Sequence, residues 1–258
     1  MGLRGRAAVV TGASRGIGRA VAIALAAEGC RVLLCARDAE PLEAVVGELD
    51  GAGVAMPVDV TAPAAAAAIV AACQRAFGRL DVVVNNAGGA VARPLPELTA
   101  DDWQAGLELN FLSAARLSVA ALPTMRTAGW GRLVHVASIG GREPDPLFAP
   151  YSAAKAALLN LSTSLSRAFA ADGVLSSCVV PGVTITELVE ANALASAART
   201  GHTTDEVMAR MLAKQSVAAG RFGTPEEIAA AVVFLASEAA SWISGATLEV
   251  DGGTLRAT

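Results

Sequence analysis

A tyrosine and a lysine four residues apart are the first residues in this sequence to suggest chemistry. Tyr151 is the only tyrosine in 258 residues, and Lys155 is one of two lysines among 20 basic residues. The run after Tyr151 is rich in alanine and leucine and predicts a helix, on which positions i and i+4 share one face. A fixed ammonium beside a phenol favours the phenolate, which lets a tyrosine exchange a proton near neutral pH. Two exposed neighbours on a helix are the alternative that the spacing alone leaves open.

The scarcity of lysine favours the chemical interpretation. The chain uses arginine for nearly all of its cations, so the lysine at position 155 indicates a task that arginine does not perform. Arginine is a planar fork that stays charged, whereas lysine is a compact charge on a flexible stem.

Three glycines in the segment VVTGASRGIGRAVAIAL predict a nucleotide-binding turn. Gly12, Gly16 and Gly18 follow an apolar run and open a helical pattern. Glycines at such a turn let backbone N–H groups approach a pyrophosphate at the helix N-terminus. A glycine-rich motif alone is weak support, but its place after the first strand of an alternating chain makes it strong.

The residues after the second apolar run distinguish between cofactors. An NAD site has a carboxylate there for the ribose 2′-hydroxyl, whereas this chain has Ala36 and Arg37. Arg37 and Arg15 could hold a 2′-phosphate from two sides, so we predict NADP(H) as the cofactor. Asp38 complicates this prediction, because its carboxylate could neutralise Arg37 or reach the ribose itself.

The elements that must position these residues alternate between short apolar runs and longer amphipathic segments. This alternation predicts an α/β fold of the Rossmann type, a doubly wound parallel sheet of about seven strands with helices on both faces. No linker interrupts it, so we expect one domain over residues 1–258. The expected strands before the last α/β unit, which ends in GATLEVDGG, are 7–11, 31–36, 54–60, 81–85, 132–138 and 175–180.

Two helix starts are explicit in the sequence. Thr224, Pro225 and Glu227 form a capping box with proline at the first helical position, and Thr203 with Glu206 repeats the relation. The strand pattern stops between residues 186 and 220. We expect a substrate lid in this insertion, with two helical segments.

Composition excludes several classes of function. Hydrophobic residues make up 53% and charged residues 17%, so the chain can form a sizeable core. The net charge is −4, and no lysine- or arginine-rich run marks a nucleic-acid binder. We expect no signal peptide and no membrane span, because the apolar runs are too short. Four cysteines without CxxC spacing and two distant histidines suggest a cytoplasmic protein without a metal site.

Taken in order, these motifs resemble the short-chain dehydrogenases/reductases over essentially the whole chain. The motifs are TGxxxGxG, NNAG at 85–88, Ser138, YSAAK at 151–155 and PG at 181–182. Within that family the chain most resembles the 3-oxoacyl-(acyl-carrier-protein) reductases and related ketoreductases. The resemblance implies an oxidoreductase that uses a nicotinamide cofactor and a small carbonyl or alcohol substrate.

The resemblance also implies roles for individual residues. Tyr151 matches the catalytic acid and base, Lys155 its partner on the nicotinamide ribose, and Ser138 the serine that binds the substrate oxygen. Asn110 matches a helix asparagine that holds a water in the proton relay. The residues assigned to the cofactor by the resemblance and the glycine turn are Gly12, Ser14, Arg15, Gly16, Ile17, Gly18, Arg37, Asp59, Val60, Asn86, Ala87, Gly88, Tyr151, Lys155, Pro181, Gly182, Thr184 and Thr186.

The residues themselves agree with two of these roles. Asn110 lies in an apolar helical pattern, where a buried asparagine is costly unless it is hydrogen-bonded. Ser138 follows the fifth expected strand, at the edge where open α/β sheets bind ligands. His135 is expected to be packed inside that strand.

Three features depart from the family pattern. Thr184 stands where an aliphatic residue usually packs on the nicotinamide. Gly129 and Asp172 stand where carrier-protein reductases tend to have basic residues, so an acidic carrier would find less to bind. The insertion at 186–220 is longer than in compact members, and its apolar face could roof a pocket or simply pack on the domain.

The leading hypothesis is an NADPH-dependent reductase of a ketone, possibly a β-ketoacyl thioester, with Tyr151 as general acid. The alternatives are an NAD-linked alcohol or polyol dehydrogenase and a non-catalytic nucleotide sensor. The family implies a homotetramer through its fourth and fifth helices, with a dimer as the fallback. In the NADP⁺ complex we expect the pKa of Tyr151 to lie below about 10, with nearby cations outweighing burial.

Overall fold

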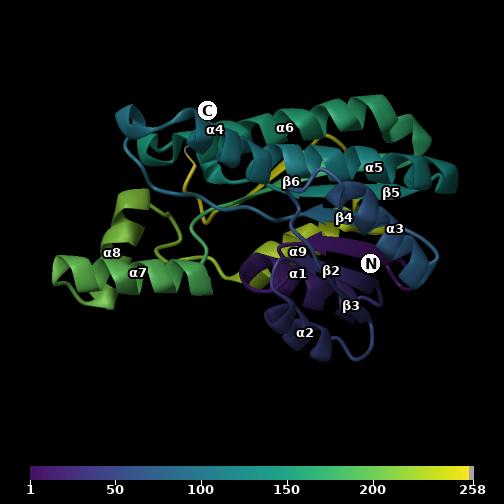
Figure 1. The fold of residues 1–258 in the computed structure, drawn as a ribbon, viewed down its shortest axis with the longest axis horizontal. Helices are drawn as coiled ribbons and strands as arrows, with labels where there is room; N and C mark the ends of the chain where they lie inside the picture. Colours follow the sequence, from purple (N-terminus) through teal and green to yellow (C-terminus); the bar gives the residue numbers. More distant parts are fainter. Residues whose placement is uncertain (256–258) are drawn as a thin grey trace.

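The protein is built on a seven-stranded parallel sheet with the strand order β3-β2-β1-β4-β5-β6-β7 (Figure 1). The computed structural model describes residues 1–255. This topology confirms the predicted doubly wound α/β fold. The strands are β1 (Ala7–Thr11), β2 (Arg31–Ala36), β3 (Gly53–Pro57), β4 (Val82–Asn85), β5 (Gly131–Val136), β6 (Val174–Pro181) and β7 (Thr247–Val250).

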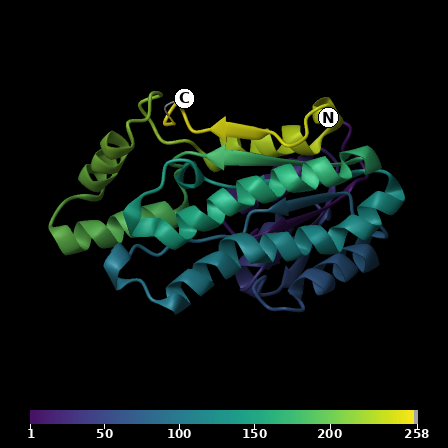
Figure 2. The same ribbon diagram turned by 90° about the horizontal axis from the view of Figure 1, so that it is seen from above.

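Helices cover both faces of this sheet. One face carries α1 (Gly16–Ala27), α2 (Ala39–Gly47) and α9 (Pro225–Ala236), and the other carries α3 (Ala65–Phe77), α5 (Ser113–Ala128) and α6 (Ala149–Phe169). The remaining helices are α4 (Ala100–Leu107), α7 (Glu187–Thr200) and α8 (Thr204–Gln215). Figures 1 and 2 show α7 and α8 standing beyond one end of the sheet.

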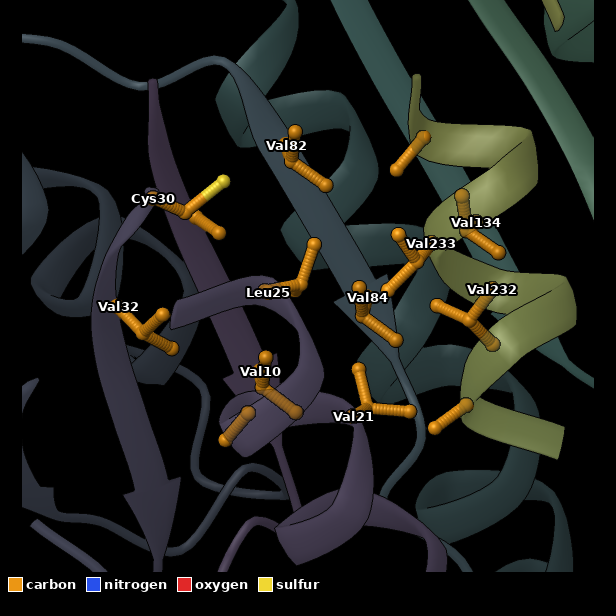
Figure 3. Close-up of a cluster of buried hydrophobic side chains, with 14 of the residues drawn as sticks. Val10, Val21, Leu25, Cys30, Val32, Val82, Val84, Val134, Val232 and Val233 are labelled. Carbon is orange, nitrogen blue, oxygen red and sulfur yellow. The ribbon is translucent and has the colours of Figure 1, made fainter. Parts of the chain in front are cut away.

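The core consists of two apolar layers, one on each face of the sheet. Because both faces are covered, the strands are nearly continuous runs of buried apolar residues. Figure 3 shows one layer, in which valines of neighbouring strands face α1 and α9. Its members include Val10, Val84, Val134, Val21, Leu25, Val232 and Val233. The second layer joins β1, β2, β4 and β5 to α3 and α5.

One expected strand is too long. The sequence pattern predicts a strand over 54–60, but β3 ends at Pro57. Asp59 turns the chain, because its Oδ1 accepts hydrogen bonds from Thr61 N at 2.9 Å and from Thr61 Oγ1 at 2.7 Å. Asp59 and Val60 therefore lie beyond the carboxyl end of the sheet.

The two predicted helix starts are confirmed. Thr203 and Thr224 are N-caps, and each forms a capping box with the glutamate three residues later. Pro225 opens α9, where its missing N–H and fixed φ suit the first turn.

The apolar spacing around Asn110 predicts a continuous α-helix. The structure differs at this point. A π-helical turn at Glu108–Leu112 separates α4 from α5 and places Asn110 at its centre. Single π turns inside helices occur frequently at functional sites. α4 then packs against α6, while α5 packs against α3.

Candidate active site

The glycine turn between β1 and α1 forms a cradle without side chains. Gly12 and Gly16 have φ values of +66° and +53°, a region that favours glycine. A Cβ on Gly18 would overlap the carbonyl oxygen of Gly12. The turn lies between β1 and β4, where the strand order reverses and α/β sheets bind dinucleotides. Its shape and position therefore fit a pyrophosphate.

Thr11 and Asn86 fasten this turn to the end of β4. Thr11 Oγ1 accepts hydrogen bonds from the backbone nitrogens of Asn86 and Ala87, each at 3.0 Å. Asn86 Nδ2 donates to the carbonyls of Thr11 and Gly12 at 2.9 and 3.2 Å. The side chain of Asn86 thus ties the cradle to β4. Thr11 is a further site residue, which the motifs in the sequence do not indicate.

The two arginines predicted to bind a 2′-phosphate are both exposed and follow the carboxyl ends of neighbouring strands, β1 and β2. Arg15 is the exposed N-cap of α1, and Arg37 is exposed one residue after β2. Hydrogen bonds from Thr61 lower the pKa of Asp59, and the charge of Arg37 lowers it further. Arg37 is therefore close enough to the post-β3 turn to act electrostatically on it.

The other residues assigned to the cradle are half-buried. Ser14 and Ile17 belong to the glycine segment, and Ile17 packs against the core on the α1 face. Val60 packs against the opposite layer and borders a small cavity that Ala87 also lines.

Tyr151, Lys155 and Ser138 meet at the carboxyl end of β5. The Lys155 Nζ atom lies 5.6 Å from the centre of the Tyr151 ring and donates a 2.7 Å hydrogen bond to the carbonyl of Val136. The hydroxyl of Tyr151 is near enough to Ser138 for the serine hydroxyl to lower the pKa of the tyrosine. Ser138 Oγ also accepts from Gly140 N at 3.1 Å. The expected adjacency of Tyr151 and Lys155 is therefore present.

The protein's own groups shift the pKa of Tyr151 upward, and the expectation of a lowered pKa in the NADP⁺ complex stays a prediction, because it includes the charge of the cofactor. Burial raises the pKa of Tyr151, and the hydroxyl of Ser138 lowers it only in part. Burial also lowers the pKa of Lys155 to about 8. Lys155 is 3% exposed, so desolvation disfavours its charged form. The two shifts move the tyrosine and the lysine toward their neutral forms.

Asn110 fixes the backbone turn that follows β4. It is 2% exposed, and its Oδ1 accepts from Gly89 N at 3.0 Å. Its Nδ2 donates to the carbonyls of Gly89 and Gly106 at 2.9 and 3.0 Å. A Cβ on Gly88 would lie 2.8 Å from Asn110 Oδ1 and 3.3 Å from Lys155 Nζ. Gly88 thus occupies the narrow space between these two side chains.

The segment after β6 connects the site to α7. Pro181 ends β6, and Thr184 is buried with its Oγ1 donating to the carbonyl of Gly182 at 3.2 Å. Thr186 is the N-cap of α7, with its Oγ1 accepting from Val189 N at 3.3 Å. Its Cγ2 would lie 3.2 Å from a Cβ on Gly16, so α7 begins beside the glycine cradle.

An ion pair joins the insertion to the segment before Tyr151. Lys214 in α8 contacts Asp145 Oδ2 at 2.9 Å, and Asp145 Oδ1 accepts from Leu147 N at 3.0 Å. The Lys214 side chain is 66% exposed, and surface pairs of this kind contribute little stability. The second lysine of the chain thus connects α8 to the loop that precedes α6.

Residues 1–255 contain no group of three or more histidine, cysteine, aspartate or glutamate side chains that could hold a metal ion. Within the same range no helix is long and apolar enough to cross a membrane. The four cysteines are buried and free of disulfides.

Comparisons with known proteins agree with this geometry. The sequence model of the short chain dehydrogenase family matches residues 6–196. A 3-oxoacyl-[acyl-carrier-protein] reductase from Escherichia coli is 37% identical over 253 residues, 98% of either chain. A cis-4-hydroxycyclohexanecarboxylate dehydrogenase from Sinomonas cyclohexanicum is 39% identical over 96% of each chain. The crystal structure of L-sorbose reductase from Gluconobacter frateurii, complexed with NADPH and L-sorbose, matches with a TM-score of 0.96. It is 32% identical, and the match covers 100% of this chain and 99% of that one.

Proposed function

Because the chain belongs to the short chain dehydrogenase family, we propose that it is an NADPH-dependent reductase that converts a ketone to a secondary alcohol. The observation that carries this proposal is the meeting of Tyr151, Ser138 and Lys155 at the carboxyl end of β5, on the edge that also carries the glycine cradle. A relative named as a carrier-protein reductase and a structural neighbour complexed with NADPH support the direction and the cofactor.

The proposed chemistry divides among the residues of the site. When bound, the nicotinamide supplies the hydride that adds to the carbonyl carbon. The hydroxyls of Ser138 and Tyr151 hold the carbonyl oxygen, and Tyr151 gives its proton to that oxygen as the electron pair moves there. The raised pKa of Tyr151 keeps this proton in place until the oxygen takes it. The ammonium of Lys155 then stabilises the phenolate, and Asn110 keeps the turn at Gly88 and Gly89 in position.

A substrate screen tests the proposed function directly. NADPH oxidation is measured against β-ketoacyl thioesters and free ketones, with the Tyr151→Phe variant as the control for background oxidation. Consumption of NADPH by at least one ketone is expected. Binding of NADPH without turnover of any ketone would favour the nucleotide-sensor alternative. Faster NAD-linked oxidation of alcohols would favour the dehydrogenase alternative.

The proposal also concerns the group that carries the ketone substrate, either acyl carrier protein or coenzyme A. Gly129 and Asp172 replace the basic residues expected in reductases of carrier-bound substrates, and Asp172 is paired with Arg126 at 2.6 Å. An acidic carrier protein would meet a carboxylate at this surface. The same ketoacyl group offered on coenzyme A and on acyl carrier protein shows whether the carrier contributes to KM.

Arg37→Asp should reverse the cofactor preference. The unaltered protein is expected to bind NADPH about tenfold or more tightly than NADH, because Arg15 and Arg37 make charge-assisted contacts with the 2′-phosphate. A carboxylate at position 37 repels that phosphate and can accept from a ribose 2′-hydroxyl. Dissociation constants from fluorescence titration check this, with Arg75→Asp on α3 as a charge-matched control. Equal affinity of the unaltered protein for both cofactors would contradict the assignment.

Carbonyl reduction should weaken as the pH rises through about 8. The pKa of Lys155 is lowered to about 8, so its ammonium is present below that pH and lost above it. Tyr151 has a raised pKa and keeps its proton over the same range. Profiles of kcat between about pH 6 and 10 should therefore show a single alkaline limb. The Lys155→Met variant should have a low kcat that no longer decreases at alkaline pH. If the alkaline decrease persists in that variant, it is caused by the titration of another group.

The assembly proposed for this chain is a homotetramer through the helices around Asn110 and Tyr151. Leu112 at the end of the π turn and Val119 in α5 are exposed to 36% and 58%, and Ala153 and Ala156 are exposed on α6. These small and apolar residues suit close helix contact between copies. Light scattering at micromolar concentration should give about four times the chain mass of 25.9 kDa. A dimer would leave one of the interfaces unused, and a monomer would contradict the proposal.

Two further features belong to the proposed function. The chain forms one domain, in which α7 and α8 act as the lid of the substrate site; the pair of Lys214 with Asp145 supports this role. We place the protein in the cytoplasm, and four buried cysteines without disulfides agree with a reducing compartment.

A further inference from the structure

A buried histidine that the proposed chemistry does not use lies beside Lys155. His135 is 0% exposed and pairs in register with Asn85 of β4 and Cys178 of β6. Partners in a parallel sheet point to the same face, so these side chains share the face covered by α5 and α6. Lys155 is near enough for its charge to act on the histidine.

The hydrogen bonds of Asn85 fix which nitrogen of His135 carries a proton. The hydroxyl of Ser118 donates to the carbonyl of Ala114 at 2.7 Å, so its oxygen must accept from Asn85 Nδ2 at 3.0 Å. The second hydrogen of that amide points to His135 Nδ1 at 3.2 Å. His135 Nδ1 is therefore an acceptor, and the neutral ring has its proton on Nε2.

From His135 the hydrogen bonds continue in one direction to α6. Nε2 donates to Ser176 Oγ at 3.2 Å, and Ser176 and Ser162 are 2.9 Å apart. Ser162 is near enough to the sulfur of Cys178 for its hydroxyl to lower the pKa of that thiol, in part against burial. The thiol points to the carbonyl of Leu158 at 3.9 Å. The series, which we call the His135 chain, runs from Asn85 through His135, Ser176, Ser162 and Cys178 to Leu158.

The charges around His135 keep it neutral. Burial, and to a smaller extent the charge of Lys155, lower its pKa to about 3. The groups facing the ring are hydroxyls, an amide and a thiol from β4, β6, α5 and α6, together with the ammonium of Lys155. Burial raises the pKa of the Cys178 thiol to about 11, so this thiol stays protonated near neutral pH. Protonation of the ring would also break its bond from Asn85.

The His135 chain joins β5 and α6 at the level of Lys155. Lys155 Nζ donates to the carbonyl of Val136, the residue after His135 in β5. The chain ends at Leu158, three residues after Lys155 in α6. The strand that supplies the acceptor and the helix that supplies the ammonium are thus held together by the same buried hydrogen bonds.

We propose that His135 is a positioning residue that, through this chain, sets the distance between Lys155 and its acceptor on β5. Loss of the ring's two hydrogen bonds leaves one amide hydrogen of Asn85 and one acceptor position of Ser176 unpaired in the core, although Asn85 keeps Ser118 and Ser176 keeps Ser162. Such unpaired buried groups draw in water or shift the backbone. Lys155 would then be better hydrated and less firmly placed beside Tyr151. The effect on turnover rests on the proposed reductase function, whereas the effect on Lys155 itself does not.

The lysine content of the chain allows a direct test. Protein grown with ¹³Cε-lysine has two lysine signals, from Lys155 and Lys214, and Lys214→Arg identifies them. Titration by NMR should give the unaltered Lys155 a pKa of about 8. In His135→Leu, which keeps the bulk and removes both hydrogen bonds, the Lys155 pKa should rise toward the ordinary value of about 10.4. His135→Asn, which keeps an acceptor for Asn85 and an N–H donor, should return the pKa toward that of the unaltered protein.

Activity gives the second readout. His135→Leu should lower kcat about tenfold or more while NADPH affinity stays unchanged, because misplacement near the chemistry is costly. His135→Asn should recover part of that loss. A purely structural histidine predicts a lower Tm in His135→Leu with the Lys155 pKa and kcat of the folded protein unchanged; that result, or a lower Lys155 pKa, would overturn the proposal. If His135→Leu does not fold, Ser176→Ala removes one link and should shift the pKa in the same direction. If the unaltered protein reduces no ketone, the proposed function fails, and the NMR titration still decides the role of His135.

Discussion

Tyr151→Phe is expected to abolish carbonyl reduction, with kcat reduced by about 10³-fold or more, while NADPH still binds. General acid catalysis supplies roughly 10²–10⁴-fold, and the neighbouring Ser138 has no comparable acidity to replace it. The phenyl ring keeps the packing of the tyrosine, so the cradle at Gly12 to Gly18 is undisturbed. Stopped-flow measurement of one turnover and a titration of NADPH fluorescence separate chemistry from binding. Full activity in this variant would show that another group gives the proton.

The single tyrosine supports this experiment with a spectroscopic one. The phenolate absorbance of the protein reports Tyr151 alone. Because burial raises the pKa of Tyr151, the signal should appear above about pH 10 in the protein without cofactor. Ser138→Ala should raise the pKa further, since the hydroxyl that lowers it is lost. A midpoint below 10 would show that the charge of Lys155 outweighs burial after all.

Gly88→Ala should remove most of the activity by filling the space between Asn110 and Lys155. The added Cβ would lie 2.8 Å from Asn110 Oδ1, which is closer than two such atoms can stay. Either the turn or Lys155 must move, and a displacement of about 1 Å can cost 10²-fold in rate. Single-turnover rates and the Tm of the variant measure the effect on chemistry and on folding.

Gly89→Ala is the matched control for this substitution. Its Cβ would lie 3.7 Å from Leu109 Cδ2, an ordinary contact, and neither Gly88 nor Gly89 has a positive φ. We expect Gly89→Ala to keep most of the rate of the unaltered protein. Equal losses in the two variants would mean that the turn tolerates no side chain at all, and the specific conflict with Asn110 would be refuted.

Features encoded by local spacing could be predicted from the sequence. The glycine turn, the capping boxes at Thr203 and Thr224 and the strand runs depend on residues close together in the chain, which is why most strand bounds agree within one or two residues. β3 is the exception. Its apolar alternation continues to Val60, but the turn formed by Asp59 and Thr61 ends the strand earlier.

Features set by packing could not be predicted in this way. The π turn at Asn110 depends on hydrogen bonds to Gly89 and Gly106, and apolar spacing alone does not distinguish such a turn from an α-helix. The pKa of Tyr151 depends on burial by segments distant in sequence. His135 is packed inside its strand as the sequence predicts. Its polar partners lie 41 and 50 residues away in the chain, so local spacing does not indicate its hydrogen bonds.

The π turn allows the helical segment formed by α4 and α5 to pack against two different helices. A continuous α-helix presents a single apolar stripe along its whole length. The extra residue in the π turn Glu108–Leu112 rotates the apolar stripe of α5 by about 100° relative to that of α4. As a result, α4 packs against α6 while α5 packs against α3. The arrangement depends on the number of residues in the turn as well as on the hydrogen bonds of Asn110. Deletion of one residue would restore a single stripe and rotate Asn110 away from Gly89.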